Sequence, residues 1–374
     1  MRKYGIVSYN LHCNFTNYGS ALQQYALQRV VNEISPDEVQ GIVMDYCPDC
    51  LSTVNVLNPF GNLWDKDEET RRECELTLPA IKENYDKFTS FFESQYPLSK
   101  GRYTSSNFND SKEVEELDGY ICGSDTIWCI REFDGFDDGY YANYDCMKHN
   151  SVSYAASFGD VDWTESELDT LVDRMHNFNA IGIREDGMVN YISENTDVDV
   201  QRVVDPTLLL TGDDYQCITN QEDVIGEPYI LMYSRRYNPA MEAYTEKMAE
   251  ELGCRIVDIS LRATNKDKGH IMRYDAGVEE FLGLCKHAKL VVTNSFHGLI
   301  FAAQMHTDFV VFSREQASTK IDQLLALMGL EDQKMIDGSE TTHLNINYDK
   351  VESNLAPWRA KSLAYLRRAL EVED

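Results

Sequence analysis

His297 is the residue whose sequence surroundings best fit a chemical role. It lies in the run VVTNSFHGL, residues 291–299, where an apolar strand ends, small polar residues turn the chain, and a helix is expected to begin near Gly298. Backbone amides at a helix N-terminus favour a bound anion. Because an imidazole can exchange a proton near neutral pH, His297 is a candidate general acid or base. The competing interpretation is a hydrogen-bonded structural histidine. His270, by contrast, is expected on the surface.

Basic side chains are scarce, yet several arginines follow predicted strands directly. The carboxyl ends of parallel strands form the usual ligand crevice of an open sheet, and a guanidinium binds carboxylate or phosphate through a planar fork of donors. We therefore expect at least two of these arginines to meet a small anion. Alternatively, each caps a helix or pairs with an acid, as Glu185 or Asp186 could do for its neighbour Arg184. The arginines are Arg184, Arg235, Arg236, Arg262 and Arg314.

Two polar turns follow predicted strands in the first half of the chain. The run Asn17-Tyr18-Gly19-Ser20 lies between the first strand and the first helix, and its residue types suit a tight turn and a helix cap. Asp125, which follows the strand at 119–122, can accept a hydrogen bond from a sugar hydroxyl or can cap a helix. Neither turn has the glycine spacing and lysine of a phosphate loop or a dinucleotide fingerprint.

These residues are carried by alternating short apolar runs and amphipathic stretches, which indicate α/β layers around largely parallel sheets. We place a domain boundary near residue 212, giving a first domain at 1–212, a second at 213–345 and a C-terminal helix at 346–374. Residues 60–118 are polar and helical in part, and we interpret them as a surface insertion or lid of the first domain. The second half has predicted strands at 229–233, 255–259, 290–293 and 309–312. Two such halves would form a cleft, a common place for a ligand.

Composition bounds the function. The chain has 374 residues, with 34 Lys and Arg against 63 Asp and Glu, a formal net charge of −29. Such a surface repels nucleic acid and anionic lipid, so we expect neither as a partner. No apolar run is long enough for a membrane span, and no secretory signal begins the sequence, which favours a cytoplasmic protein. The ten cysteines include only one close pair, Cys47 and Cys50. A structural zinc site usually needs four ligands, so we do not expect one.

Taken in order, six short motifs resemble the polysaccharide pyruvyl transferase family over about residues 5–330. The resemblance implies two Rossmann-like domains facing a cleft, similar to the two-domain GT-B-like glycosyltransferases. It also implies transfer of a pyruvyl group from phosphoenolpyruvate to two hydroxyls of a sugar, in a cell-surface polysaccharide or its precursor, without a cofactor. The motifs are Asn17-Tyr18-Gly19, Gly123-Ser124-Asp125 with Trp128, the run 153–159, Ile183-Arg184-Glu185, the run 204–209, and Asn294-Ser295-Phe296-His297-Gly298.

On this resemblance His297 is the catalytic general acid and Arg184 binds the donor. We also expect Asn294 and Ser295 at the donor anion, and place Asn17, Tyr18, Gly19 and Asp125 in the acceptor or cleft loops. Characterised members often carry Arg-Leu-His-Gly where this chain has Ser-Phe-His-Gly, so an arginine is missing at position 295. The basic residues that would compensate are Arg235, Arg236, Arg314 and Lys320.

Two alternatives stay open on the sequence. One is a glycosyltransferase-like enzyme that uses a nucleotide-linked sugar, and the other is a non-catalytic sugar-binding protein. The sequence identifies neither the acceptor sugar nor the oligomeric state.

Overall fold

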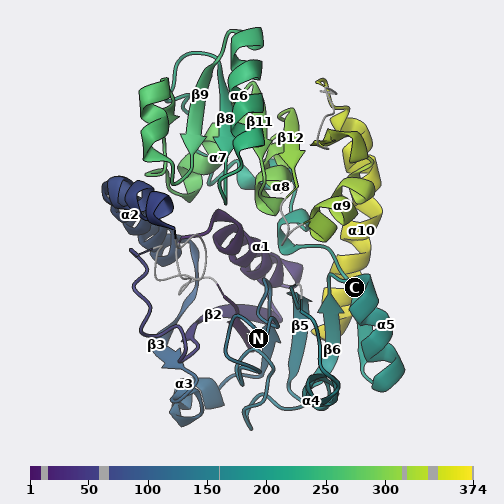
Figure 1. Cartoon of the computed structure of the whole chain (residues 1–374). Coiled ribbons are helices and arrows are strands. Elements are labelled where there is room, and N and C mark those ends of the chain that lie inside the picture. Colours follow the sequence, from purple (N-terminus) through teal and green to yellow (C-terminus); the bar gives the residue numbers. More distant parts are fainter. Residues whose placement is uncertain (10–15, 59–66, 160, 314–317, 336–343, 373–374) are drawn as a thin grey trace. The chain divides into compact units, whose positions relative to one another are not determined.

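The computed structural model describes residues 1–9, 16–58, 67–159, 161–313, 318–335 and 344–372 (Figure 1). The chain divides into two compact units. The first comprises Met1–Val56, Phe92–Leu210 and Pro357–Asp374, and the second comprises Leu57–Phe91 and Thr211–Ala356.

The first unit is built on a seven-stranded parallel sheet with the order β3-β2-β1-β4-β5-β6-β7. Every residue of β4 and β5 is buried, as is usual for parallel strands covered on both faces. The strand order reverses between β1 and β4, the place where open α/β sheets bind ligands. The strands are β1 (Arg2–Val7), β2 (Val39–Cys47), β3 (Leu98–Thr104), β4 (Gly119–Cys122), β5 (Ser151–Ala156), β6 (Phe178–Ile183) and β7 (Asp199–Arg202). The helices are α1 (Tyr18–Ile34), α3 (Lys112–Glu115), α4 (Glu165–Met175) and α5 (Asp186–Asn195).

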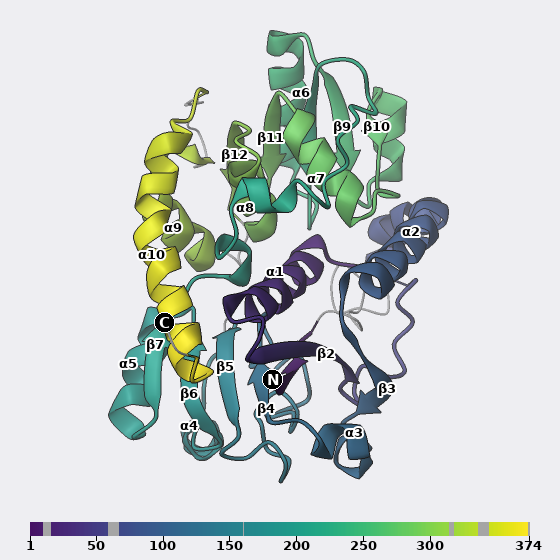
Figure 2. The same ribbon diagram turned by 180° about the vertical axis from the view of Figure 1, so that it is seen from behind.

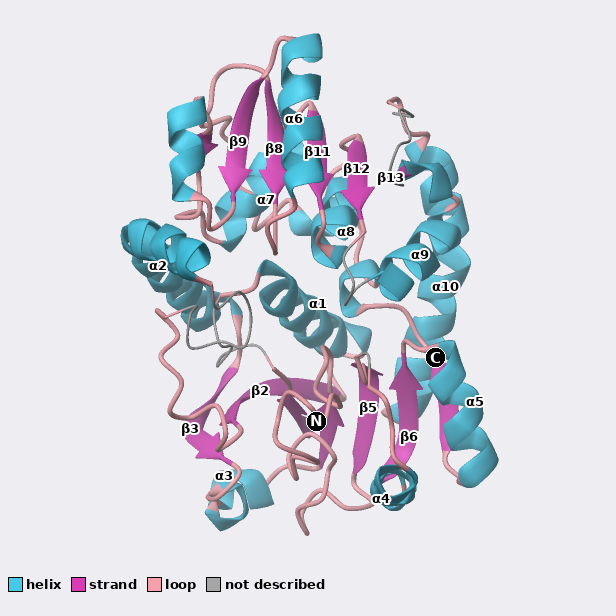
Figure 3. Ribbon diagram, in the orientation of Figure 1, coloured by secondary structure: helices cyan, strands magenta, loops and turns pink. Residues whose placement is uncertain are grey.

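The second unit has a six-stranded parallel sheet with the order β10-β9-β8-β11-β12-β13. In Figure 3 the arrows of β8, β9, β11 and β12 point the same way, and Figure 2 shows β10 beside β9. This sheet reverses its order between β8 and β11. The strands are β8 (Tyr229–Tyr233), β9 (Arg255–Ile259), β10 (Ile271–Met272), β11 (Leu290–Thr293), β12 (Phe309–Phe312) and β13 (Lys334–Met335). The helices are α6 (Pro239–Leu252), α7 (Val278–His287), α8 (Phe296–Gln304) and α9 (Ser318–Met328).

Two helices contain residues of both units. Helix α2 (Glu68–Gln95) belongs to the second unit up to Phe91, and α10 (Tyr348–Ala369) belongs to the first unit from Pro357. Within the second unit, the Asn84 side chain of α2 donates to the Ala276 carbonyl at 2.5 Å. Within the first, the Tyr365 hydroxyl of α10 donates to the Ser153 carbonyl at 2.8 Å. The sequence led us to expect residues 60–118 in the first domain, whereas the second compact unit combines Leu57–Phe91 with Thr211–Ala356.

The cores of the two units differ in composition. The first is rich in aromatic side chains, with Trp128 in contact with Tyr141 and Phe158 at ring-centroid distances of 5.7 and 5.0 Å. The second is mainly aliphatic and methionine-rich, with Met232 and Val292 among its buried residues. Among the described helices, none has both the length and the apolar character needed to cross a bilayer.

Candidate functional site

His297 lies in the first turn of α8, directly after the carboxyl end of β11. Ser295 is the N-cap of this helix, and its hydroxyl accepts a hydrogen bond from the Gly298 amide at 3.2 Å. The imidazole is partly exposed and meets the Phe296 ring edge-on at a centroid distance of 5.1 Å. The helix that follows is almost entirely buried, so packing fixes its first turn. His297 thus stands at the reversal point of the second sheet, where the dipole of α8 favours an anion.

Asn294 joins this turn to the loop after β8. Its side-chain oxygen accepts from the Arg235 amide at 2.9 Å, and its side-chain nitrogen donates to the Arg236 carbonyl at 2.7 Å. Asn294 is only 1% exposed. We expected Asn294 and Ser295 at the donor anion. In the structure, Asn294 holds the loop that carries Arg235 and Arg236, while Ser295 caps α8.

The other cationic candidates are placed differently. Arg262 follows β9, stacks on the Tyr237 ring at 4.1 Å and pairs with Glu69 of α2 at 2.7 Å, so a carboxylate already compensates its charge. Lys320 lies in the first turn of α9. Arg314 falls outside the described residues.

In the first unit, the reversal between β1 and β4 gathers the N-terminus of α1 and the loop after β4. Asn17 is the N-cap of α1, accepting from the Gly19 amide at 3.0 Å, and Tyr18 and Gly19 are buried in the first turn. Ser20 donates to the Asp125 carboxylate at 2.5 Å. Asp125 adopts a left-handed backbone with φ 82° and is partly exposed. Of the four predicted residues, Asp125 therefore presents a carboxylate, whereas the other three build the helix terminus.

Arg184 follows β6 and pairs with Asp205. The two side chains approach to 2.5 Å and are 12% and 1% exposed. The same carboxylate accepts from the Thr207 amide at 3.0 Å. Glu185 and Asp186 were the partners suggested by the sequence, but Glu185 accepts from Ser157, and Asp186 pairs with Arg202 at 2.6 Å. Asp205, which pairs with Arg184, thus comes from the segment after β7. The net charge of this buried pair is close to zero.

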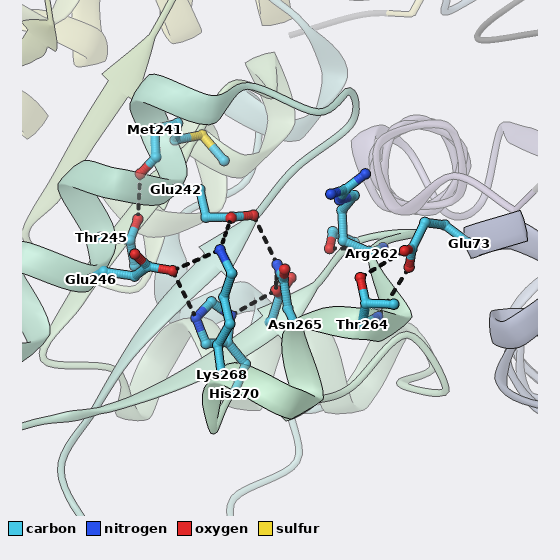
Figure 4. Close-up of polar contacts among 12 residues, drawn as sticks. Glu73, Met241, Glu242, Thr245, Glu246, Arg262, Thr264, Asn265, Lys268 and His270 are labelled. Atoms are coloured by element: carbon cyan, nitrogen blue, oxygen red, sulfur yellow. Dashed lines mark hydrogen bonds and ion pairs between the residues drawn. The ribbon is translucent and has the colours of Figure 1, made fainter. Parts of the chain in front are cut away.

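A second polar cluster lies beside β9 in the second unit and was missed by the sequence analysis (Figure 4). Asp258, fully buried in β9, accepts from His270 at 3.0 Å and from Asn265 at 2.9 Å. The prediction that His270 lies on the surface is wrong, because its side chain is 2% exposed. Asn265 also donates to Glu242 of α6 at 2.9 Å.

Lys268 completes this cluster from the loop between β9 and β10. Its ammonium contacts Glu242 and lies 3.0 Å from Glu246, as Figure 4 shows. Burial raises the pKa of Glu242, but the hydrogen bonds from Lys268 and Asn265 outweigh it and hold that pKa below its usual value. The cluster fixes the loop that carries Arg262 and Thr264. No sequence signal pointed to it, since its members are distributed between residues 242 and 270.

Comparison of the sequence with protein families gave one relevant match. The family model described as polysaccharide pyruvyl transferase matches residues 17–316, which is most of the chain. A comparison with curated proteins gave no match.

Comparison of the structure with solved structures shows the fold. A putative UDP-N-acetylglucosamine 2-epimerase from Listeria monocytogenes aligns with a TM-score of 0.51 and 12% identity, covering 98% of this chain and 91% of that one. S. aureus MnaA, solved with UDP, aligns with a TM-score of 0.48 and 12% identity over 99% and 91% of the two chains. E. coli ADP-heptose LPS heptosyltransferase II aligns with a TM-score of 0.41 and 11% identity over 96% and 99%. The alignment with the Listeria structure and the two parallel sheets confirm the predicted GT-B-like α/β architecture with two Rossmann-like units.

Proposed function

Because the chain belongs to the polysaccharide pyruvyl transferase family, we propose that it moves a pyruvyl group from phosphoenolpyruvate to two hydroxyls of one sugar. The product is a cyclic ketal on a cell-surface polysaccharide or its precursor, and the leaving group is phosphate. Family membership indicates a transferase and suggests a sugar acceptor. The donor and the polysaccharide are our proposal.

His297 is the proposed general acid. It protonates the methylene carbon of the donor, and C2 becomes a cation-like centre. One sugar hydroxyl adds to C2 and loses its proton. The second hydroxyl then displaces phosphate and loses its proton in turn, which balances the reaction. The observation that carries this proposal is the partly exposed imidazole in the first turn of α8, at the reversal point of a parallel sheet.

Positive groups must hold the carboxylate and phosphate of the donor while the acid acts. Arg184 is the donor ligand implied by the family, but the carboxylate of Asp205 compensates most of its positive charge. We therefore assign it a hydrogen-bonding role in which the planar fork matters more than the charge. In the same unit, Asp125 is our candidate to accept a hydrogen bond from the sugar, because its carboxylate is partly exposed.

The test follows hydrogen exchange at C3 of phosphoenolpyruvate in heavy water by NMR, together with calorimetric binding. Protonation by His297 predicts exchange in the native protein. His297→Gln should lose at least about a hundredfold in exchange rate while still binding the donor. His306→Gln is the control, because His306 is an exposed histidine of the same unit. Absence of both binding and exchange, with simple methyl glycosides present, would refute the proposal.

A nucleotide-sugar transferase is the second candidate, and the serine at position 295 is what favours it. Without the family's arginine at this position, the chain lacks one contact expected for phosphoenolpyruvate, and a different anionic donor is the alternative. Thermal-shift measurements separate the two functions. Stabilisation by a nucleotide sugar but not by phosphoenolpyruvate would favour the second candidate, since a ligand stabilises the folded state that binds it.

A further inference from the structure

We propose that Arg235 and Arg236, held in place by Asn294, form the anion-binding site beside His297. They would take the place of the guanidinium that characterised family members have at position 295. The ligand class is a small phosphorylated carboxylate. In naming phosphoenolpyruvate as the probe, the inference rests on the proposed function, although the anion site itself can be tested separately.

The fold brings the two loops together. Strands β8 and β11 are hydrogen-bonded neighbours, and their last residues, Tyr233 and Thr293, are register partners. The loop with the two arginines leaves β8, and the His297 turn leaves β11. Because β8 and β11 are parallel, both loops leave the same carboxyl edge of the sheet. The sheet order reverses between these two strands, which is where α/β sheets bind ligands.

Hydrogen bonds connect the two loops directly. Thr293 donates from its hydroxyl to the Tyr233 carbonyl at 2.7 Å, which ties the two strand ends. The next residue, Asn294, uses both ends of its amide on the arginine loop, at 2.9 Å to the Arg235 amide and 2.7 Å to the Arg236 carbonyl. Ser234 donates to that same carbonyl at 2.5 Å. A buried side chain that satisfies a donor and an acceptor of one loop fixes the backbone of that loop.

The first turn of α8 also packs tightly on the end of β8. A Cβ at Gly298 would lie 2.4 Å from the Thr293 hydroxyl oxygen and 2.9 Å from a ring carbon of Tyr233. Only glycine therefore lets the helix approach this closely. The consequence is that the His297 turn rests on the strand from which the arginine loop departs.

Ser295 cannot supply the missing charge. Its hydroxyl accepts the hydrogen bond of the Gly298 amide and so serves the helix N-terminus.

Electrostatics supports the location of Arg235. Burial raises the pKa of the Tyr274 phenol, and the positive charge of Arg235 opposes that increase. The charge of Arg235 therefore acts on Tyr274, which lies in the segment after β10 and thus at the same end of the sheet. Guanidinium groups carried by this loop and the N-terminal amides of α8 are the kinds of donor that a phosphate or carboxylate requires.

The experiment measures binding of phosphoenolpyruvate and of inorganic phosphate by calorimetry. Arg235→Gln and Arg236→Gln are each compared with Arg255→Gln, a same-unit control at the amino end of β9 whose ion pair with Glu227 is exposed. Loss of one charge-assisted contact should weaken phosphoenolpyruvate binding about tenfold to a hundredfold in at least one of the two variants. The control should bind as the native protein does.

The outcomes separate the two proposals. Native-like binding of phosphoenolpyruvate by both arginine variants overturns the inference and leaves the proposed function standing. If the native protein binds phosphate but not phosphoenolpyruvate, and an arginine variant weakens that binding, the anion site stands and the proposed donor falls. Binding of neither probe by the native protein overturns both.

Asn294 is tested as a positioning residue. Asn294→Ala should weaken phosphoenolpyruvate binding about tenfold, because the arginine loop loses its two hydrogen bonds to the Asn294 side chain. Thr307→Val is the matched control, since Thr307 is buried in the same unit and donates one hydrogen bond to the Cys285 carbonyl. Urea denaturation of both variants reports the loss of stability. If Asn294→Ala destabilises the protein but binds the donor normally, Asn294 is merely structural and the positioning role is refuted.

Discussion

At the scale of single residues, the buried pair of Arg184 and Asp205 shows how a predicted ligand can also be a structural element. An arginine that binds an anion must be held in one orientation, and a carboxylate behind it does so at the expense of its charge. The side chain of Asp205 is 1% exposed, so its charge depends on this partner and on Thr207.

Removing that partner is expected to be costly. Asp205→Ala should lower the free energy of unfolding by about 3–5 kcal/mol, because it leaves the guanidinium of Arg184 mostly buried without its counter-ion. Urea denaturation followed by circular dichroism measures the change. Glu227→Gln breaks the exposed pair with Arg255 and should cost less than about 1 kcal/mol. Equal losses in the free energy of unfolding for the two substitutions would show that burial does not make the Arg184–Asp205 pair more costly to break.

Local sequence could predict the His297 turn, because strand end, cap and helix start are adjacent in the chain. It could not predict the role of Asn294, whose partner Arg235 is 59 residues away. The same limit explains the error at His270, whose partner Asp258 lies on β9. It also explains why Asp205 was not among the partners that the sequence suggested for Arg184. Such contacts depend on strand order, and local spacing does not encode strand order.

At the scale of elements, strands with continuous apolar runs were predictable. The strands expected at 229–233, 255–259, 290–293 and 309–312 coincide with β8, β9, β11 and β12. The packing of helix α2 could not be predicted from the sequence, because polar residues such as Glu73 and Asn84 are buried on its contact face. Their partners belong to loops far along the chain, so the hydrophobic periodicity of α2 gives no indication of what it packs against.

Glu73 provides a test of how α2 is held in the second unit. Its carboxylate accepts from the Thr264 hydroxyl at 2.6 Å and from the Thr264 amide at 3.0 Å (Figure 4). Glu73→Ala should destabilise the protein by about 1–3 kcal/mol, since two partly buried donors of Thr264 lose their acceptor. Glu75→Ala, at an exposed position of the same helix, should change stability by less than about 0.5 kcal/mol. Thermal unfolding checks both, and a harmless Glu73 substitution would contradict this account of α2.

Asp137 holds three segments of the first unit together. Its carboxylate accepts from the Tyr46 hydroxyl at 2.8 Å, the Ser105 hydroxyl at 2.8 Å and the Gly139 amide at 3.0 Å. Burial raises the pKa of Asp137, although these hydrogen bonds oppose the change. Folding therefore favours the protonated form. The stability that this proton contributes is full below the unfolded pKa of about 3.9 and is lost as pH rises through the folded pKa.

This linkage predicts a pH-dependent mutational cost. Asp137→Asn cannot titrate, so its loss in free energy of unfolding should be larger near about pH 4.5 than near about pH 7.5. Urea denaturation at both pH values gives the two costs. Asp134→Asn, at an exposed position of the same segment, should show no such difference. A cost for Asp137→Asn that grows with pH would mean that its pKa is lowered by folding.

At the scale of the whole molecule, acidic residues outnumber basic ones, and the basic side chains act mainly through local contacts. With 63 acidic against 34 basic residues, the folded chain repels itself at neutral pH. Many of the cations in the described residues are paired with carboxylates, among them Arg131 with Glu167 and Arg174 with Asp138. An anion site therefore requires a dedicated arrangement, and the clamp of Asn294 on the arginine loop is the one that we propose.

Self-repulsion makes stability depend on salt in a definite direction. Raising NaCl from about 20 mM to about 200 mM shortens the Debye length from about 20 Å to about 7 Å, which screens repulsion between distant carboxylates. The midpoint of thermal unfolding should therefore rise at pH about 7.5. Near the sequence pI of about 4.6 the net charge is small, and the same change in salt should have little effect. A midpoint that falls with salt at neutral pH would show instead that attractive ion pairs outweigh the net repulsion, and that the charges are arranged more favourably than their sum of −29 implies.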